Sequence, residues 1–202
     1  MMEIGDWLYG VFGTSEWGIL LCIFLIFLVD ALIFPALPEL FFAMGMMYGS
    51  AHTNSLIFGT ELLLVVLAAE IIGVLALYLI VSHLRVPKMI EKAVNKYIGF
   101  LVLGDERLIL LNRVAPMIPF AGAFIRIAGW DIKKSLAYVV IGCVAKYGLI
   151  AVMCDYFYSY YSGPDAQLFT LIFIVLVIAV SFVVSYIIKK RTGSRSPEQE
   201  QN

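Results

Sequence analysis

The stretches DALIFPALPE (residues 30–39) and RVAPMIP (residues 113–119) each place two prolines and a charge inside apolar sequence. Proline breaks a helix because it has no N–H and its ring clashes with the preceding turn. In lipid, the freed backbone groups need partners inside the protein or a wet cavity. Two interrupted apolar segments at corresponding places in two halves of a chain are typical of a transporter's binding site. The predicted breaks are Pro35, Pro38, Pro116 and Pro119.

Composition places the chain among the polytopic helical membrane proteins. Of its 202 residues, 62% are hydrophobic and 14% are charged, and the mean hydropathy is +0.94. A soluble domain is about half apolar and a quarter charged. Several apolar runs approach or exceed the ~20 residues that a helix needs to cross a bilayer. We expect one integral membrane domain over residues 1–188 and a polar, disordered cytoplasmic tail over residues 189–202.

The apolar runs and their breaks predict the order of the elements. The expected elements are an amphipathic N-terminal helix over 2–12, a hairpin over 17–49, a span over 55–84, a surface helix over 86–104, a hairpin over 107–130, and spans over 135–155 and 165–188. Both hairpins are proline-broken and re-entrant. They enter from opposite faces, which predicts an all-α membrane fold with inverted pseudo-symmetry.

Charge is divided unequally along the chain. All 14 Lys and Arg residues lie at or after Arg85, whereas the charged residues before it are all acids. If both broken segments are hairpins, the basic clusters at 85–96, 133–134 and 189–195 share one face. Basic flanks mark the cytoplasmic side. We therefore expect a protein of the plasma membrane with a cytoplasmic C-terminus.

Three acids within the apolar runs are candidates for proton coupling or ion pairing. An intramembrane charge costs ~3 kcal/mol or more even on lenient scales, so such a residue is functional by default. Glu39 is expected to titrate or to hold an arginine until a ligand arrives, and the alternative is a wet helix N-terminus. Asp30 is either functional or a cap near the break. Glu70 is either a proton relay or part of a structural salt bridge.

Arg113 and Arg126 are the candidate substrate-binding residues. A guanidinium presents a planar fork of N–H donors that suits a phosphate group. The alternative for each arginine is an ion pair that only fixes the hairpin, and for Arg113 the partner would be Glu39 or Glu70. Lys146 also lies within an apolar run, and its depth favours an acidic partner.

Nothing in the sequence indicates a metal site, a cofactor or an enzyme. The three cysteines are scattered, without CxxC or Cys/His spacing. The chain has no Ser-His-Asp arrangement, HExxH motif or P-loop. We therefore expect a protein that is not an enzyme, binds no metal or cofactor, and has membrane lipids rather than nucleic acid as its partners.

Three motifs in a fixed order resemble the DedA family, which is also the VTT or SNARE-associated Golgi protein superfamily. They are residues 30–39, the sequence AEIIG at 69–73 followed by Tyr78, and RVAP at 113–116 followed by Ala128-Gly129. The resemblance covers roughly residues 17–155. The family often has Glu where this chain has Asp30, and a second arginine where it has Pro119. Arg126 is the only other arginine of that hairpin. The sequence leaves open whether it takes the place of the family's second arginine.

The resemblance implies two opposed re-entrant hairpins that meet at mid-membrane. Members of the family are associated with moving phospholipids or polyprenyl phosphates between leaflets, and some with the proton motive force. It thus implies a flippase or scramblase for an anionic, phosphate-bearing lipid, with proton coupling as a further expectation. The alternative is a proton-coupled transporter of a small ion or drug involved in membrane homeostasis. Glycine and alanine on several helices would allow close association, so a homo-oligomer stays open.

Overall fold

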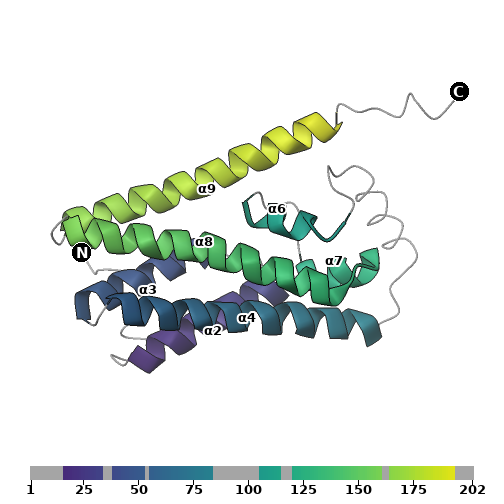
Figure 1. The fold of residues 1–202 in the computed structure, drawn as a ribbon, viewed down its shortest axis with the longest axis horizontal. Coiled ribbons are helices and arrows are strands. Elements are labelled where there is room, and N and C mark those ends of the chain that lie inside the picture. The colour runs from purple at the N-terminus through teal and green to yellow at the C-terminus, as the bar shows by residue number, and fades with distance from the viewer. Residues whose placement is uncertain are drawn as a thin grey trace, which may run out of the picture.

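The computed structural model describes residues 16–33, 38–52, 55–83, 105–114, 120–160 and 164–193. Every regular element within these ranges is a helix (Figure 1). The predicted all-helical fold is therefore confirmed for the described part of the chain. The helices are α2 (Glu16–Leu32), α3 (Pro38–His52), α4 (Ser55–His83), α6 (Leu108–Val114), α7 (Ala121–Ala128), α8 (Ile132–Tyr160) and α9 (Pro164–Gly193).

Several predicted features lie outside the described residues. They are the helix over 2–12, the surface helix over 86–104, and the prolines Pro35, Pro116 and Pro119. The fourth proline, Pro38, is buried and is the first residue of α3. Proline suits this position because the amide hydrogen that it lacks would have no helical partner there.

The two last helices extend beyond the apolar runs that predicted them. α8 covers Ile132–Tyr160 and α9 covers Pro164–Gly193. α9 therefore includes residues 189–193, which are the first residues of the expected tail. Residues 194–202 lie outside the described part of the chain. An apolar run marks the width of the membrane core rather than a helix end, and Lys and Arg are themselves good helix formers.

Asp131 caps the start of α8. Its Oδ1 accepts hydrogen bonds from the backbone N–H groups of Lys133 at 2.8 Å and Lys134 at 3.1 Å. The backbone N–H of Asp131 donates to Oε1 of Glu106 at 3.0 Å, which ties the start of α8 to the residues before α6. The N–H groups of Lys134 and Lys133 lower the pKa of Asp131. The pKa of Glu106 is lowered by its own N–H and by that of Asp131.

We expect this junction to lose stability in acid. A carboxyl group whose pKa is lower in the folded than in the unfolded state stabilises the fold above its unfolded pKa. That stability is lost as the pH falls through the folded pKa. Because unfolded carboxyl groups titrate near pH 4, the protection of amides 131–136 against hydrogen exchange should fall below about that pH. In Asp131→Ala, protection should be lower from the start and depend less on pH, and identical profiles for the two proteins would contradict the capping role of Asp131.

The helix α2 runs alongside α4 in the same direction. A Cβ added to Gly73 would lie 2.5 Å from the Cβ of Ala31, near the end of α2. Earlier in both helices, Leu62 of α4 and Ile23 of α2 both lie near Gly45 of α3, where an added Cβ would be 3.0 Å from Leu62 and 3.8 Å from Ile23. Glycine and alanine thus allow the close approach of these helices.

The helix α3 runs back in the opposite direction. Besides the contact of Gly45 with Leu62, the rings of Tyr48 and Phe58 lie 5.8 Å apart between centroids. Later residues of α3 therefore meet earlier residues of α4. As a result, α2 begins and α3 ends at the end of the bundle where α4 begins (Figure 1).

The short helices α6 and α7 occupy the opposite end. A Cβ added to Gly122 in α7 would lie 2.3 Å from the backbone oxygen of Val74, in the second half of α4. α7 is capped at its C-terminus by Gly129, whose φ of 70° is a left-handed conformation that favours glycine. Since Glu106 and Asp131 are hydrogen-bonded, α6 begins and α7 ends beside the start of α8.

The main core lies between the first three described helices and α8. Tyr147 of α8 is buried, and its ring centroid is 5.1 Å from that of Phe27 in α2 and 5.1 Å from that of Phe42 in α3. Such aromatic contacts add to the large apolar area that these side chains bury. This core surrounds the middle of the bundle.

The helix α9 contacts the bundle mainly through its first half. Thr170 and Ile174 are buried, and the rings of Phe157 and Phe173 lie 5.9 Å apart between centroids. Beyond these residues α9 diverges from α8 (Figure 1). Large apolar side chains are exposed there, among them Val180, Phe182, Val183, Tyr186 and Ile187.

Two helices are long and apolar enough to cross a membrane, by their length and composition. They are Leu56–His83 within α4 and Ile132–Phe157 within α8, while the apolar stretch Leu168–Val184 of α9 is shorter. In the most apolar stretch of each of these helices, 28% is buried inside the protein. Large apolar side chains are exposed along both helices, among them Leu64, Ile72, Leu79, Ile141, Leu149 and Val152.

Candidate functional site

The middle of the bundle holds a buried ion pair between α4 and α6. The guanidinium of Arg113 donates from Nη1 to Oε1 of Glu70 at 2.7 Å and from Nη2 to Oε2 at 2.8 Å. The side chain of Glu70 is 4% exposed and that of Arg113 is 15% exposed. Bidentate pairs of this kind are among the strongest polar contacts in proteins. They also hold the guanidinium in one orientation.

A glycine of α8 makes room for Arg113. A Cβ added to Gly142 would lie 2.6 Å from Cγ of Arg113 and 3.4 Å from a side-chain carbon of Leu110. The arginine stem therefore lies directly against the backbone of α8. The Nε of Arg113 is buried and has no hydrogen-bond partner among the described residues.

A second ion pair joins α3 to α8. Nζ of Lys146 donates a hydrogen bond to Oε1 of Glu39, and the two side chains are 18% and 13% exposed. Glu39 lies in the first turn of α3, where the helix dipole favours a negative charge. Lys146 also lies 5.7 Å from the ring centroid of Tyr147, within cation–π range. The expected acidic partner of Lys146 is therefore confirmed.

Both ion pairs lie against α8. The stem of Arg113 packs on Gly142, and Lys146, which pairs with Glu39, lies four residues further along the same helix. We call the four charged groups the charge cluster (Glu39, Glu70, Arg113 and Lys146).

Both pairs join an acid from the first half of the chain to a base from the second half. Glu39 lies in the first turn of α3 and contacts the middle of α8, while Arg113 lies in the last turn of α6 and contacts the middle of α4. This reciprocity reflects the absence of Lys and Arg before Arg85. The charge cluster therefore holds the two halves of the bundle together.

The structure brings three of the predicted site residues together. Glu39, Glu70 and Arg113 all belong to the charge cluster, and Arg113 pairs with Glu70 rather than with Glu39. Asp30 lies in the last turn of α2 with a half-buried side chain, so its role stays a prediction.

Arg126 is not part of the charge cluster. It lies in the last turn of α7, and its side chain is exposed. The second cation near the bundle centre is Lys146, which was expected from the sequence to be paired but was not assigned to the site. The usable signal was its position within an apolar run, because a cation there needs a partner.

No group of three or more His, Cys, Asp or Glu side chains among the described residues is placed to hold a metal ion. The cysteines Cys22, Cys143 and Cys154 are buried and free. They occupy three separate positions along α2 and α8, so they act in packing as small apolar side chains.

Comparison of the chain with models of protein families, with curated proteins and with solved structures found no match. The resemblance to the DedA family therefore rests on the sequence motifs. A functional proposal for this chain has to be built on the geometry of the charge cluster.

Proposed function

We propose that the chain is an integral membrane protein whose two broken segments are re-entrant hairpins. Soluble monomers rarely expose contiguous apolar patches beyond a few hundred Å², and α4 and α8 each expose large apolar side chains along most of their length. The paired helices are short, with 17 and 15 residues in α2 and α3 and 7 and 8 in α6 and α7. None reaches the ~20 residues of a full span. Because the pairs begin and end at opposite ends, they form inverted hairpins.

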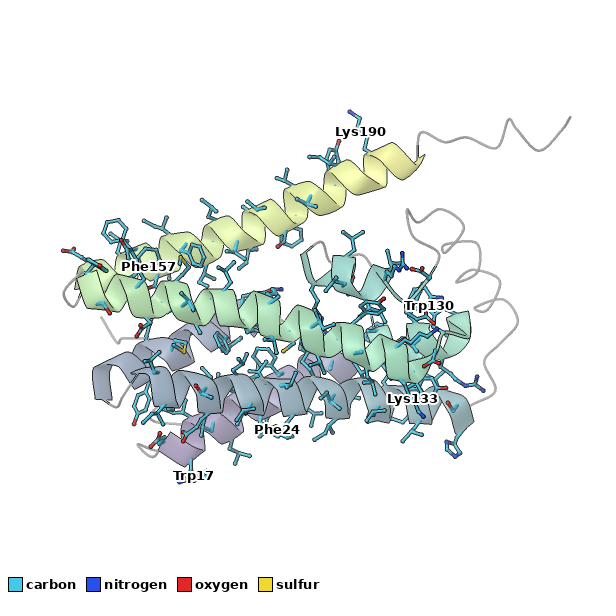
Figure 2. All side chains as sticks on the ribbon, viewed as in Figure 1. Trp17, Phe24, Trp130, Lys133, Phe157 and Lys190 are labelled. Atoms are coloured by element: carbon cyan, nitrogen blue, oxygen red, sulfur yellow. The ribbon has the colours of Figure 1, made fainter. Side chains whose placement is uncertain are left out.

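The charges at the two ends of the bundle support one orientation of this membrane protein. Lys133 at the start of α8 and Lys190 near the end of α9 lie toward one end, and Phe157 lies toward the other (Figure 2). The acids Glu16, Asp155 and Asp165 belong to the helix ends at that other end. By the positive-inside rule the basic end is cytoplasmic. The C-terminus is then cytoplasmic, and the membrane that we propose is the plasma membrane.

The function that the charge cluster supports best is the movement of an anionic, phosphate-bearing lipid between leaflets. The observation that carries this proposal is the bidentate pair of Arg113 with Glu70, buried among apolar helices. A guanidinium that fits a carboxylate through two parallel hydrogen bonds also fits a phosphate group. Binding is then an exchange of one anion for another at Arg113.

Proton coupling follows from the same exchange. When phosphate takes the guanidinium, the carboxylate of Glu70 loses its partner inside an apolar environment. A proton neutralises such a carboxylate at lower cost than leaving it charged. The lipid and the proton would therefore bind together, in a carrier rather than an enzyme.

Lipid binding by purified full-length protein tests the proposal. We expect Arg113→Lys to bind phosphatidylglycerol roughly tenfold more weakly than the wild type in a native mass spectrometry titration, because lysine keeps the charge but loses the fork. Arg113→Ala should bind more weakly still.

The matched control is Arg126→Ala, which removes an exposed arginine of the neighbouring helix. It should bind the lipid like the wild type. If all three variants bind and move phosphatidylglycerol at the wild-type level, Arg113 is no lipid ligand. The alternative of a proton-coupled transporter for small ions or drugs would then take its place.

A further inference from the structure

We propose that Lys146 is a second cationic ligand for the same anion, so that Glu39–Lys146 and Glu70–Arg113 are two exchangeable ion pairs of one binding site. This inference rests on the proposed function and deepens it. Lys146 then has the role for which the sequence motifs suggested Arg126. The chemistry concerned is a phosphate group, whether of a lipid headgroup or free in solution.

Lys146 lies on the face of α8 that Arg113 contacts. Gly142, against which Arg113 packs, lies four residues before Lys146. Side chains four residues apart share one helix face, with about 5–6 Å between their Cβ atoms. The stems of the two cations therefore lie about one helical turn apart along α8, on the same face of that helix.

The two ion pairs are built alike. Each consists of a cation of the second half of the chain and a carboxylate of the first half, and each lies near the middle of a long helix. The side chain of Glu39 is 13% exposed, against 4% for Glu70. The Lys146 pair is thus the less buried of the two and the easier to open.

A phosphate group can use more donors than one arginine supplies. A guanidinium covers two phosphate oxygens in its bidentate mode, and an ammonium provides three further N–H donors. Arg126 is exposed on α7 and is not part of the charge cluster. Lys146 is the cation that the charge cluster adds beside Arg113.

Two variants that each remove an entire pair test this arrangement without leaving an unpaired buried charge. They are Glu39→Gln/Lys146→Gln and Glu70→Gln/Arg113→Gln, with Arg126→Gln as the control. Binding of phosphatidylglycerol is titrated by native mass spectrometry, and inorganic phosphate is titrated in parallel. Thermal unfolding followed by circular dichroism checks that each variant is folded.

We expect Glu39→Gln/Lys146→Gln to unfold close to the wild-type temperature and yet to bind phosphatidylglycerol roughly tenfold to a hundredfold more weakly, the range for losing a charge-assisted hydrogen bond. The single variant Lys146→Arg keeps a cation next to Glu39, so it should bind phosphatidylglycerol within about threefold of the wild type. A purely structural role would leave binding unchanged in the folded double variant. Weaker binding of the lipid alone identifies a headgroup as the ligand, and weaker binding of inorganic phosphate alone identifies free phosphate.

The outcomes separate this inference from the proposed function. Weaker binding in both double variants supports both. Weaker binding only in Glu70→Gln/Arg113→Gln overturns the role of Lys146 and leaves the proposed function standing. Weaker binding only in Glu39→Gln/Lys146→Gln would mean that Arg113 is not a ligand of the anion, which overturns the arrangement of two cations. Wild-type binding in both overturns the proposed function together with the inference.

Discussion

Replacing Glu70 alone with glutamine is expected to lower the free energy of unfolding by about 3–5 kcal/mol, the usual cost of breaking a buried ion pair from one side. The loss comes mainly from the partner that remains. Arg113 is always charged, and in the variant its guanidinium lies among apolar helices without a carboxylate. The same reasoning gives a large loss for Arg113→Gln, which leaves the carboxylate of Glu70 unpaired.

The double variant Glu70→Gln/Arg113→Gln is expected to recover most of this stability. Two neutral side chains of similar size replace the two charges, and buried ion pairs are often replaced by neutral groups at little cost. Denaturant unfolding of the four proteins in detergent micelles gives the coupling energy of the pair directly. The control is Glu61→Gln, near the start of the same helix, which should change stability little. Losses that simply add in the double variant would show that the two residues are not energetically paired.

The variant Gly122→Ala is expected to lower the free energy of unfolding by about 2–3 kcal/mol, as for other overpacked sites. Its new Cβ would lie 2.3 Å from the backbone oxygen of Val74 and 3.0 Å from the backbone N of Tyr78. Backbone atoms within a helix cannot rotate away as a side chain does. The whole of α7 would have to shift away from α4.

Gly148→Ala is the matched control for this prediction. Gly148 lies in the middle of α8, and a Cβ added there meets nothing within 4 Å. Alanine is the better helix former, so this variant should gain up to about 1 kcal/mol. Thermal unfolding of both variants in the same detergent measures the difference. Equal effects of the two substitutions would mean that α7 and α4 are not in close contact.

Local sequence determined the helical character of the described part of the chain. The apolar composition predicted helices, and Pro38 at the first position of α3 lies where a break was expected, while the other three predicted proline breaks lie outside the described residues. Apolar runs did not predict the true helix ends, because caps such as Asp131 and charged helix formers decide them. The sequence also predicted that the acids and bases within apolar runs would have partners, because an unpaired charge in such surroundings is costly.

The tertiary structure alone decided which charges meet. Arg113 could have paired with Glu39 or Glu70, and the sequence favoured neither. The choice depends on where α6 lies against α4 and α8, and this is set by small residues such as Gly142 that let one helix approach another. The same packing brings Lys146 to Glu39 and leaves Arg126 exposed on α7. A sequence pattern shows which face of each helix is apolar. Which helices that face contacts is decided by the sum of many packing interactions across the chain.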